Sequence, residues 1–225
     1  MFKVRQIYYK DLQRIFNMSR TQDFEPLLNP TSDKYLESGV IRRMYESGDY
    51  INNDYYGVVS HKFYKKIHKS SEYVLNTISE DVESPDVYSF FSKNPKINLI
   101  TQGQQWHELY LDIYKIIADR LEWNIDLSDE SHKMEGIFSN HWIANIHTFK
   151  EYCEEYLIPV MDLMENNKLL SNLCNQDVKY INDVKLSPEE CLKVFKKPYY
   201  TYHCFILERL FPLFCYLTNK TVKHI

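Results

Sequence analysis

Hydrophobic and polar positions follow two different spacings along the chain, and this pattern predicts strands separated by helices. Short runs rich in aromatic and β-branched residues, which are typical of strands, cover 2–9, 55–60, 86–91 and 138–146. Apolar residues three and four positions apart, which are typical of amphipathic helices, cover 33–46, 64–69, 71–78, 102–122, 148–165 and 202–219. This alternation predicts an α/β fold with a mostly parallel central sheet flanked by helices.

Local signals set the limits of several of these elements. Ser32 or Asp33 is expected to cap the helix that ends at Gly48, and Ser187 followed by Pro188 predicts another helix start. Pro159 is expected to kink or end the helix over 148–165. Weaker signals predict the start of a helix over 10–17, loops at 26–30 and around Pro95, and a loop or short helix over 166–182.

Composition indicates a folded globular chain. With 225 residues, 44% hydrophobic and 15% aromatic, we expect a single domain over 1–225, whose C-terminal part is helical from about residue 148. Nineteen tyrosines and twelve phenylalanines are many. They fit either an aromatic core or a surface that binds carbohydrate or a partner protein.

Charge and cysteine usage narrow the class of protein further. A net charge of −4 and a pI near 6.1 argue against general nucleic-acid binding. The five cysteines have no metal-type spacing, and their odd number without a leader sequence predicts reduced thiols in a cytoplasmic protein. No apolar run reaches 18 residues, and the apolar segment 205–217 has the length of a buried helix. Attachment to the inner face of the membrane through aromatic residues stays open.

A basic cluster follows the aromatic strand over 55–60. Gly57 in this strand allows a close approach of another backbone. Ligands of α/β sheets bind beyond the carboxyl ends of strands, so this cluster is a candidate phosphate site. Its members are Ser60, His61, Lys62, Lys65 and Lys66. The alternative is a solvated basic helix start. The sequence contains neither a Walker-type loop nor a Gly-x-Gly-x-x-Gly motif.

Two other strand regions carry polar residues. Asp86 begins one strand and can hold a cation or a ribose hydroxyl, or it can be a turn residue after Pro85. Asn140 and His141 interrupt the strand over 138–146, where a histidine is either a catalyst or a hydrogen-bonded core residue.

Two charged residues lie inside the apolar final helix. Glu208 and Arg209 are flanked by phenylalanine, isoleucine and leucine. Charges in such surroundings are costly unless they are paired or face a ligand. They are either a structural ion pair or an active-site base next to a phosphate-binding group. The sequence has no Gly-x-Ser-x-Gly or His-Glu-x-x-His motif, so hydrolase chemistry lacks support.

Four segments in order carry a family resemblance: Gln6–Tyr9, Tyr55–Phe63, Asp86–Tyr88 and Phe205–Phe211. With them the chain resembles bacterial surface-polysaccharide glycosyltransferases that are encoded with capsule and O-antigen genes. It is also similar to a related group in which a strand ends in His-Tyr-Arg-Arg-Tyr and the chain closes on a Glu-Arg-Leu helix. A Phe-x-x-Tyr-Cys helix, here Phe149–Cys153, lies between these motifs.

The resemblance implies a GT-A-like fold, a nucleotide-sugar donor that is UDP-linked, and a glycan or lipid-linked glycan acceptor. It assigns the diphosphate to Lys62, Lys65 and Arg209, with Ser60, His61 and Tyr8 also at the donor. Asp86 would contact the donor ribose, the sugar or a metal, and Glu208 or His141 would deprotonate the acceptor. GT-A enzymes often carry an Asp-x-Asp metal motif, but position 88 is Tyr, so metal dependence stays open.

A second hypothesis belongs to a different class of protein. The same pattern of strands and helices suits a non-catalytic α/β interaction module of a polysaccharide assembly complex. In that case Lys62 and Glu208 would lie far apart, and their replacement would leave function intact.

Overall fold

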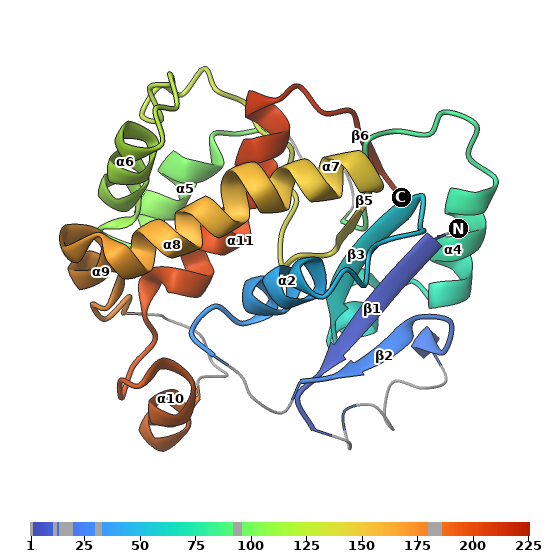
Figure 1. Ribbon diagram of the computed structural model, residues 1–225, viewed down its shortest axis with the longest axis horizontal. Helices are drawn as coiled ribbons and strands as arrows, with labels where there is room; N and C mark the ends of the chain where they lie inside the picture. The colour runs from blue at the N-terminus through green and yellow to red at the C-terminus, as the bar shows by residue number, and fades with distance from the viewer. Residues whose placement is uncertain (1, 11–12, 14–19, 30–32, 92–95, 180–185) are drawn as a thin grey trace.

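A six-stranded sheet occupies one side of the protein in the computed structural model, which describes residues 2–10, 13, 20–29, 33–91, 96–179 and 186–225 (Figure 1). The strands are β1 Phe2–Tyr8, β2 Glu25–Leu28, β3 Tyr55–Ser60, β4 Val87–Ser89, β5 Trp142–Asn145 and β6 Val222–His224. Their order in the sheet is β2-β1-β3-β5-β4-β6. The α/β class and the four predicted strands are confirmed.

One strand runs against the others. β1 is parallel to β2 and β3, and β4 is parallel to β6, but β5 is antiparallel to both β3 and β4. The sheet is therefore mostly parallel. Because β5 runs the opposite way, its first residues lie at the edge where β3 and β4 end. Residues that precede β5 thus meet residues that follow β3.

The two outer strands were not predicted. The loop expected around Pro26 is instead strand β2, which pairs with β1 from Arg5–Glu25 to Tyr8–Leu28. Proline has no N–H to donate and is tolerated at an edge strand, which is where β2 lies. β6 is three residues long and closes the other edge beside β4, too short a run for its periodicity to be recognised.

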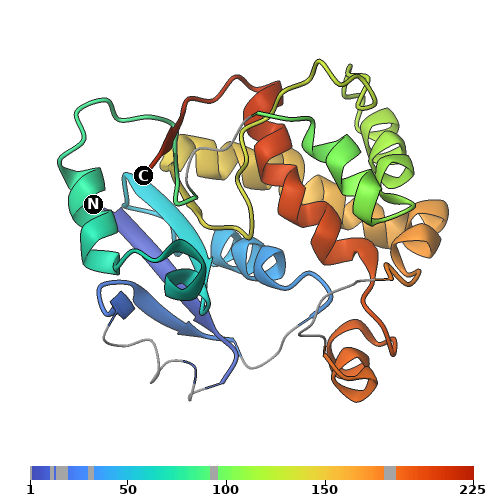
Figure 2. The same cartoon turned by 180° about the vertical axis from the view of Figure 1, so that it is seen from behind.

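Helices cover both faces of the sheet. They are α2 Glu37–Glu46, α3 Phe63–Ile67, α4 Ser71–Ser79, α5 Leu99–Trp106, α6 Tyr110–Arg120, α7 Ile146–Glu151, the π-helix η1 Tyr152–Leu157, α8 Ile158–Asn166, α9 Lys168–Cys174, α10 Pro188–Phe195 and α11 Tyr202–Leu217. Tyr56 and Val58 of β3 face the larger core, formed with α2, α6, α7, η1, α8 and α11. Tyr55 and Val59 face the opposite way, toward α3 and α4. Figure 2 shows these two teal helices from behind.

Two predicted helices have a different form in the structure. The helix expected over 102–122 is divided into α5 and α6, because His107 has an extended backbone. Asn98, the N-cap of α5, accepts hydrogen bonds from the N–H groups of Ile100 and Thr101. The helix expected over 148–165 passes Pro159 without ending, since it takes π-helical form over Tyr152–Leu157 just before the proline.

The remaining helix predictions have mixed outcomes. α9 occupies part of the segment predicted as loop or short helix, and Ser187 caps α10 in a capping box with Glu190. Most of the helix predicted over 10–17, the loop at Pro95 and the candidate cap Ser32 lie outside the described residues. Among the described helices, none has both the length and the apolar character needed to cross a bilayer.

Candidate functional site

Two buried polar side chains meet where β3 ends and β5 begins. Ser60 Oγ lies 3.0 Å from Nε2 of His141, and both residues are buried. Ser60 Oγ also accepts a hydrogen bond from the backbone N–H of Lys62, which fixes the entry to α3. Burial lowers the pKa of His141 to about 3, and the charge of Lys66 acts in the same direction. His141 is therefore a neutral imidazole at physiological pH, enclosed between the rings of Phe63 and Phe91.

The turn before β5 has an unusual backbone. Ser139 and Asn140 both have positive φ, at 56° and 52°, and the N–H of His141 donates to the carbonyl of Phe138 at 3.2 Å. Two consecutive left-handed residues form a type I′ turn, which usually needs Gly or Asn. Glu208 of α11 stabilises this turn, because its Oε1 accepts hydrogen bonds from Ser139 N at 2.9 Å and Ser139 Oγ at 3.2 Å.

One lysine of α3 reaches the same turn. The Nζ of Lys66 donates to Ser139 Oγ at 2.7 Å, so Lys66, Ser139 and Glu208 form one chain of hydrogen bonds. Lys62 lies one helical turn earlier on the same face and interacts electrostatically with His61 and Glu37. No contact among the described residues joins Lys65 to this group. The one-face arrangement predicted for three lysines thus holds for Lys62 and Lys66.

A carboxyl group from another element faces these lysines. Glu37, in the first turn of α2, is half-buried and interacts electrostatically with Lys66, Lys62 and Glu208. Burial raises the pKa of Glu37, against the opposing effects of its own backbone N–H and the two lysines. The Tyr9 hydroxyl lies close to Glu37; burial and that negative charge raise the pKa of Tyr9. A carboxyl with a raised pKa between cations is a common feature of catalytic sites.

We call this group the carboxyl-edge cluster. It consists of Tyr9, Glu37, Ser60, His61, Lys62, Lys66, Ser139, Asn140, His141 and Glu208. Burial lowers the pKa of His61 to about 4, helped by the charges of Lys62 and Lys66. Nδ1 of His61 and Oδ1 of Asn140 are buried without a hydrogen-bond partner among the described residues. Buried polar atoms are normally paired, so these two atoms distinguish the cluster from an ordinary core.

Arg209 lies next to the cluster on α11. Its guanidinium carbon is 5.4 Å from the ring centroid of Tyr110 and 5.8 Å from that of Phe138. The residues that the structure describes include no carboxylate in a salt bridge with it, and its Nε is buried without a hydrogen-bond partner among them. Glu208 is bonded to Ser139 instead. The structural ion pair between Glu208 and Arg209, one of the two alternatives, is thus not formed.

Asp86 does not lie in the cluster. It precedes β4, at the end of the sheet where β3 and β4 begin, on the side opposite to the cluster. There Asn145 Nδ2 donates to its Oδ1 at 3.0 Å. Its Oδ2 accepts from the N–H and the hydroxyl of Thr221, both at 2.8 Å. These bonds join the starts of β4 and β6 to the end of β5. Asp86 is therefore a structural residue here, and the described residues contain no group of three His, Cys, Asp or Glu that could bind a metal ion.

Tyr8, which the resemblance assigns to the donor, does not lie in the cluster, whereas its neighbour Tyr9 does. The Tyr8 side chain is buried, and its hydroxyl donates to Gln6 Oε1 inside the sheet. Tyr9 follows β1 and packs its ring edge-to-face on His61, with centroids 5.8 Å apart. Sequence reasoning also missed Glu37, because an acidic residue in a first helical turn is normally explained by capping. The signal that could have identified Glu37 is its position in the first turn of a helix that begins at the carboxyl edge of the sheet.

Comparison with known proteins identifies a similar fold. No protein-family model matches the sequence, and a search of curated proteins gives no match. Among solved structures, the chain is similar to the apo structure of WbbM, a bifunctional glycosyltransferase, with a TM-score of 0.58 and 16% sequence identity. The match covers 99% of this chain and 44% of that one, so this chain spans less than half of its length. At this identity, the match shows a shared fold.

Proposed function

We propose that the protein is a GT-A-like glycosyltransferase. It moves a sugar from a UDP-linked donor to a polysaccharide or lipid-linked glycan acceptor in bacterial surface polysaccharide synthesis, at the inner face of the membrane. The observation that carries the proposal is the carboxyl-edge cluster, in which Lys62, Lys66, Glu37 and Glu208 come together at the sheet edge where α/β proteins bind ligands. The fold shared with a glycosyltransferase structure agrees with it.

The lysines and Arg209 provide positive charge for the donor diphosphate. Lys62 and Lys66 lie one helical turn apart at the end of β3, and Lys66 is held toward the turn by Ser139. Lysine and arginine stabilise the negative charge that develops on a departing phosphate group. Because Arg209 has no carboxylate partner among the described residues, its charge is available to a second phosphate oxygen.

Glu37 is the proposed base. The acceptor hydroxyl oxygen forms a bond to the anomeric carbon of the donor, while the bond from that carbon to the β-phosphate oxygen breaks. The diphosphate leaves with the electron pair, and the hydroxyl proton passes to the Glu37 carboxylate. The raised pKa of Glu37 favours this transfer, since a base works best with a pKa closer to the working pH.

Glu208 and His141 position the site in this proposal. Glu208 engages Ser139 through Oε1 and so holds the turn that receives Lys66. His141 is fully buried, so an acceptor cannot reach it, and its depressed pKa makes it a weak base. Its bond to Ser60 instead fixes the end of β3 and the start of α3.

The metal expected at Asp86 does not fit this site. Both oxygens of the Asp86 carboxylate are hydrogen-bonded at the opposite sheet edge. No step of the proposed transfer therefore uses a metal bound there. The charge that an Asp-x-Asp site would recruit through a metal comes from Lys62, Lys66 and Arg209.

Calorimetric titration with UDP, GDP and CMP, each with and without manganese, tests the proposal. We expect one nucleotide to bind to the wild-type protein. Lys66→Met should weaken this binding about tenfold, the value of one charge-assisted hydrogen bond. Lys65→Met, a neighbouring exposed lysine outside the cluster, is the matched control and should bind like the wild type. If none of the nucleotides binds, the proposal fails and the non-catalytic interaction module becomes the better account.

A further inference from the structure

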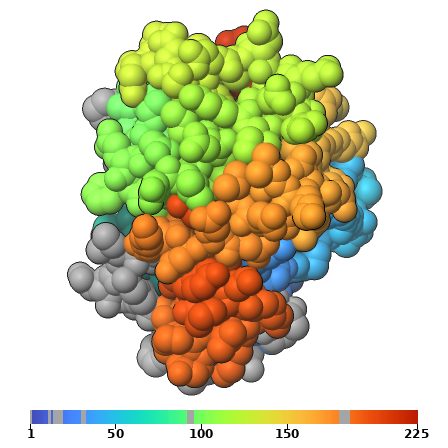
Figure 3. Space-filling model, turned by 90° about the vertical axis from the view of Figure 1, so that its left-hand side faces the viewer, coloured from blue at the N-terminus to red at the C-terminus, as the bar shows by residue number. Residues whose placement is uncertain are grey.

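One face of α11 is partly exposed, although the rest of the helix up to its proline is buried. The exposed positions are Cys204, Phe205, Glu208 and Arg209, which lie one turn apart in pairs and so share a face. Every other residue over Tyr202–Pro212 is buried. Figure 2 shows α11 beside α5, with no described helix or strand crossing in front of it. On the side shown in Figure 3, α5, α6, α9 and α10 cover most of the helix. We call these four residues the open face of α11.

Half of the open face belongs to the carboxyl-edge cluster. Glu208 accepts a hydrogen bond from the N–H of Ser139 at 2.9 Å. Cys204 lies one turn before Glu208; burial raises the pKa of its thiol, and the nearby charges of Glu208 and Glu37 act in the same direction. The Cys204 side chain therefore lies near the proposed base Glu37, and the open face forms a wall of the proposed transfer site.

The other half of the open face meets the connection between α5 and α6. The Phe205 ring lies 4.8 Å from the ring of His107, centroid to centroid, and His107 lies 6.0 Å from Tyr110. The guanidinium carbon of Arg209 is 5.4 Å from the centroid of the same Tyr110 ring. Phe205 and His107 thus form a group beside Arg209, which we call the ring subsite.

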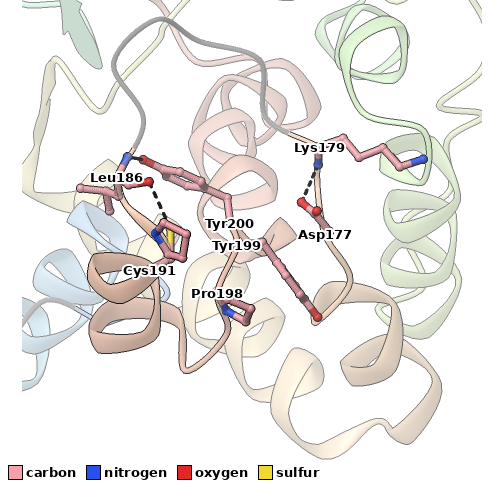
Figure 4. Close-up of a pocket in the computed structure, with 8 residues that line it drawn as sticks. Asp177, Lys179, Leu186, Cys191, Pro198, Tyr199 and Tyr200 are labelled. Carbon is pink, nitrogen blue, oxygen red and sulfur yellow. Dashed lines mark hydrogen bonds between the residues drawn. The ribbon is translucent and has the colours of Figure 1, made fainter.

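Several contacts hold the Phe205 ring in place. Tyr200 lies against it with ring centroids 6.3 Å apart, and the Tyr200 hydroxyl accepts a hydrogen bond from the N–H of Leu186 at 2.9 Å (Figure 4). The Tyr110 hydroxyl donates to the backbone carbonyl of Phe205 at 2.9 Å. A ring that is already ordered loses little conformational entropy when a ligand stacks on it.

His107 gives the ring subsite a polar group. Its side chain is buried, and its Nδ1 has no hydrogen-bond partner among the described residues. Burial lowers the pKa of His107, and the charge of Arg209 acts in the same direction, so the imidazole is neutral at physiological pH. An unpaired imidazole nitrogen beside a partly exposed ring is unusual in a core, and it suits a neutral ligand with hydroxyl groups.

We infer that the ring subsite binds the acceptor sugar, with Phe205 stacking on the C–H face of the ring and His107 bonding to a hydroxyl group. Phe205 is the neighbour of Cys204, so a sugar on Phe205 lies on the side of Glu37. It also lies about 6 Å along the helix axis from Arg209, the proposed phosphate ligand. The inference rests on the proposed function for the identity of the ligand, but it concerns residues that the donor does not use.

Saturation-transfer NMR with the methyl glycosides of glucose, galactose, mannose and N-acetylglucosamine tests the inference. We expect at least one glycoside to receive saturation from aromatic protons of the wild-type protein. Phe205→Leu keeps an apolar side chain but loses the flat ring, and it should bind this glycoside about tenfold more weakly. Phe205→Tyr keeps the ring and should bind it normally. Tyr73→Leu removes an exposed ring on α4 and is the matched control. No signal from any glycoside, or equal binding by Phe205→Leu, would overturn the inference.

Nucleotide calorimetry on the same variants separates the two proposals. Phe205→Leu should bind the nucleotide with wild-type affinity; weaker binding would place the nucleobase on Phe205 and contradict the acceptor site. Lys66→Met should bind the glycoside with wild-type affinity. Glycoside binding without nucleotide binding contradicts the proposed function and leaves the ring subsite supported as a sugar site. Nucleotide binding without glycoside binding contradicts the ring subsite alone.

Discussion

Replacement of Gly57 by alanine should open the sheet at the point where it supports the cluster. A Cβ on Gly57 would lie 2.4 Å from the carbonyl oxygen of Trp142, and 2.8 and 2.9 Å from Cγ2 and Cα of Ile143. Ordinary contacts of this kind begin at 3.4 Å, so the first contact is too short by 3.4 − 2.4 = 1.0 Å. Two of these three atoms belong to the backbone and cannot turn away. β3 and β5 must therefore separate.

The size of the effect follows from overpacking and from the short β3–β5 pairing. Overpacking of a closely packed site costs about 1–3 kcal/mol. β3 and β5 are paired only at Tyr55–Asn145 and Tyr56–Ala144, and loss of one hydrogen bond there adds about 1 kcal/mol. We expect Gly57→Ala to lower the free energy of unfolding by about 3 kcal/mol. For a chain of this length, the melting temperature falls by roughly 6–12 °C.

Thermal and urea unfolding, followed by circular dichroism, measure this change. Gly39→Ala is the matched control, because its Cβ would meet only the carboxylate end of Asp33, at 2.8 and 2.9 Å. That side chain must shift within its bonds to Tyr35 N and Arg43, a cost that is offset by the preference for alanine over glycine within a helix, about 1 kcal/mol. Gly39→Ala should therefore stay within about 1 kcal/mol of the wild type. If Gly57→Ala melts like the wild type, the close approach of β3 and β5 is wrong.

Three further predictions concern charged and titrating groups. Hydrogen bonds from Arg5 and the other groups around Asp49 hold the pKa of Asp49 below its unfolded value of about 3.9. The ionised Asp49 therefore stabilises the fold above about pH 4, and this contribution to the free energy of unfolding is lost as the pH falls further. Asp49→Asn should cost about 2 kcal/mol at neutral pH in urea unfolding and flatten the acid side of the stability profile; an unchanged profile would refute the network. The His141 imidazole should show no NMR titration between about pH 5 and pH 8. Its folded pKa of about 3 lies below the unfolded value of about 6.5, so the free energy of unfolding should decrease as the pH falls from about 6.5 toward about 3. An NMR titration of His141 near pH 6.5 would contradict its burial. Glu208→Ala should lower the free energy of unfolding by about 2 kcal/mol, and Glu208→Gln by less, because Gln still accepts from Ser139. Equal stability of the alanine variant would show that the turn does not depend on Glu208.

The sequence predicted those parts of the fold that local patterns determine. The aromatic and β-branched run at 55–60 and the apolar run at 202–219 both became elements near the expected limits, since such residue patterns are strong local signals. β2 and β6 escaped prediction because their residues form strands only through pairing with β1 and β4. Their stabilisation is tertiary, and no local pattern shows it.

The candidate site was predictable to the extent that its residues follow strands. The position of Lys62 and Lys66 after β3 was enough to place them at the carboxyl edge. The direction of β5 was not predictable from local sequence, and it decides that His141 meets Ser60. Glu37 comes from a helix far away in the chain, so only the three-dimensional structure brings it to Lys66.

The transfer reaction itself tests the central claim most directly. Release of nucleoside diphosphate from a panel of UDP-, GDP- and CMP-sugars (CMP release for the last) should be measured with glycan acceptors present. The wild-type protein should release the nucleotide from one of these donors. Glu37→Gln should lower the rate of this release about 100-fold or more, which is the usual contribution of a general base. Glu46→Gln, at the far end of the same helix, should react at the wild-type rate. No release from any donor, or wild-type activity in Glu37→Gln, would contradict the account.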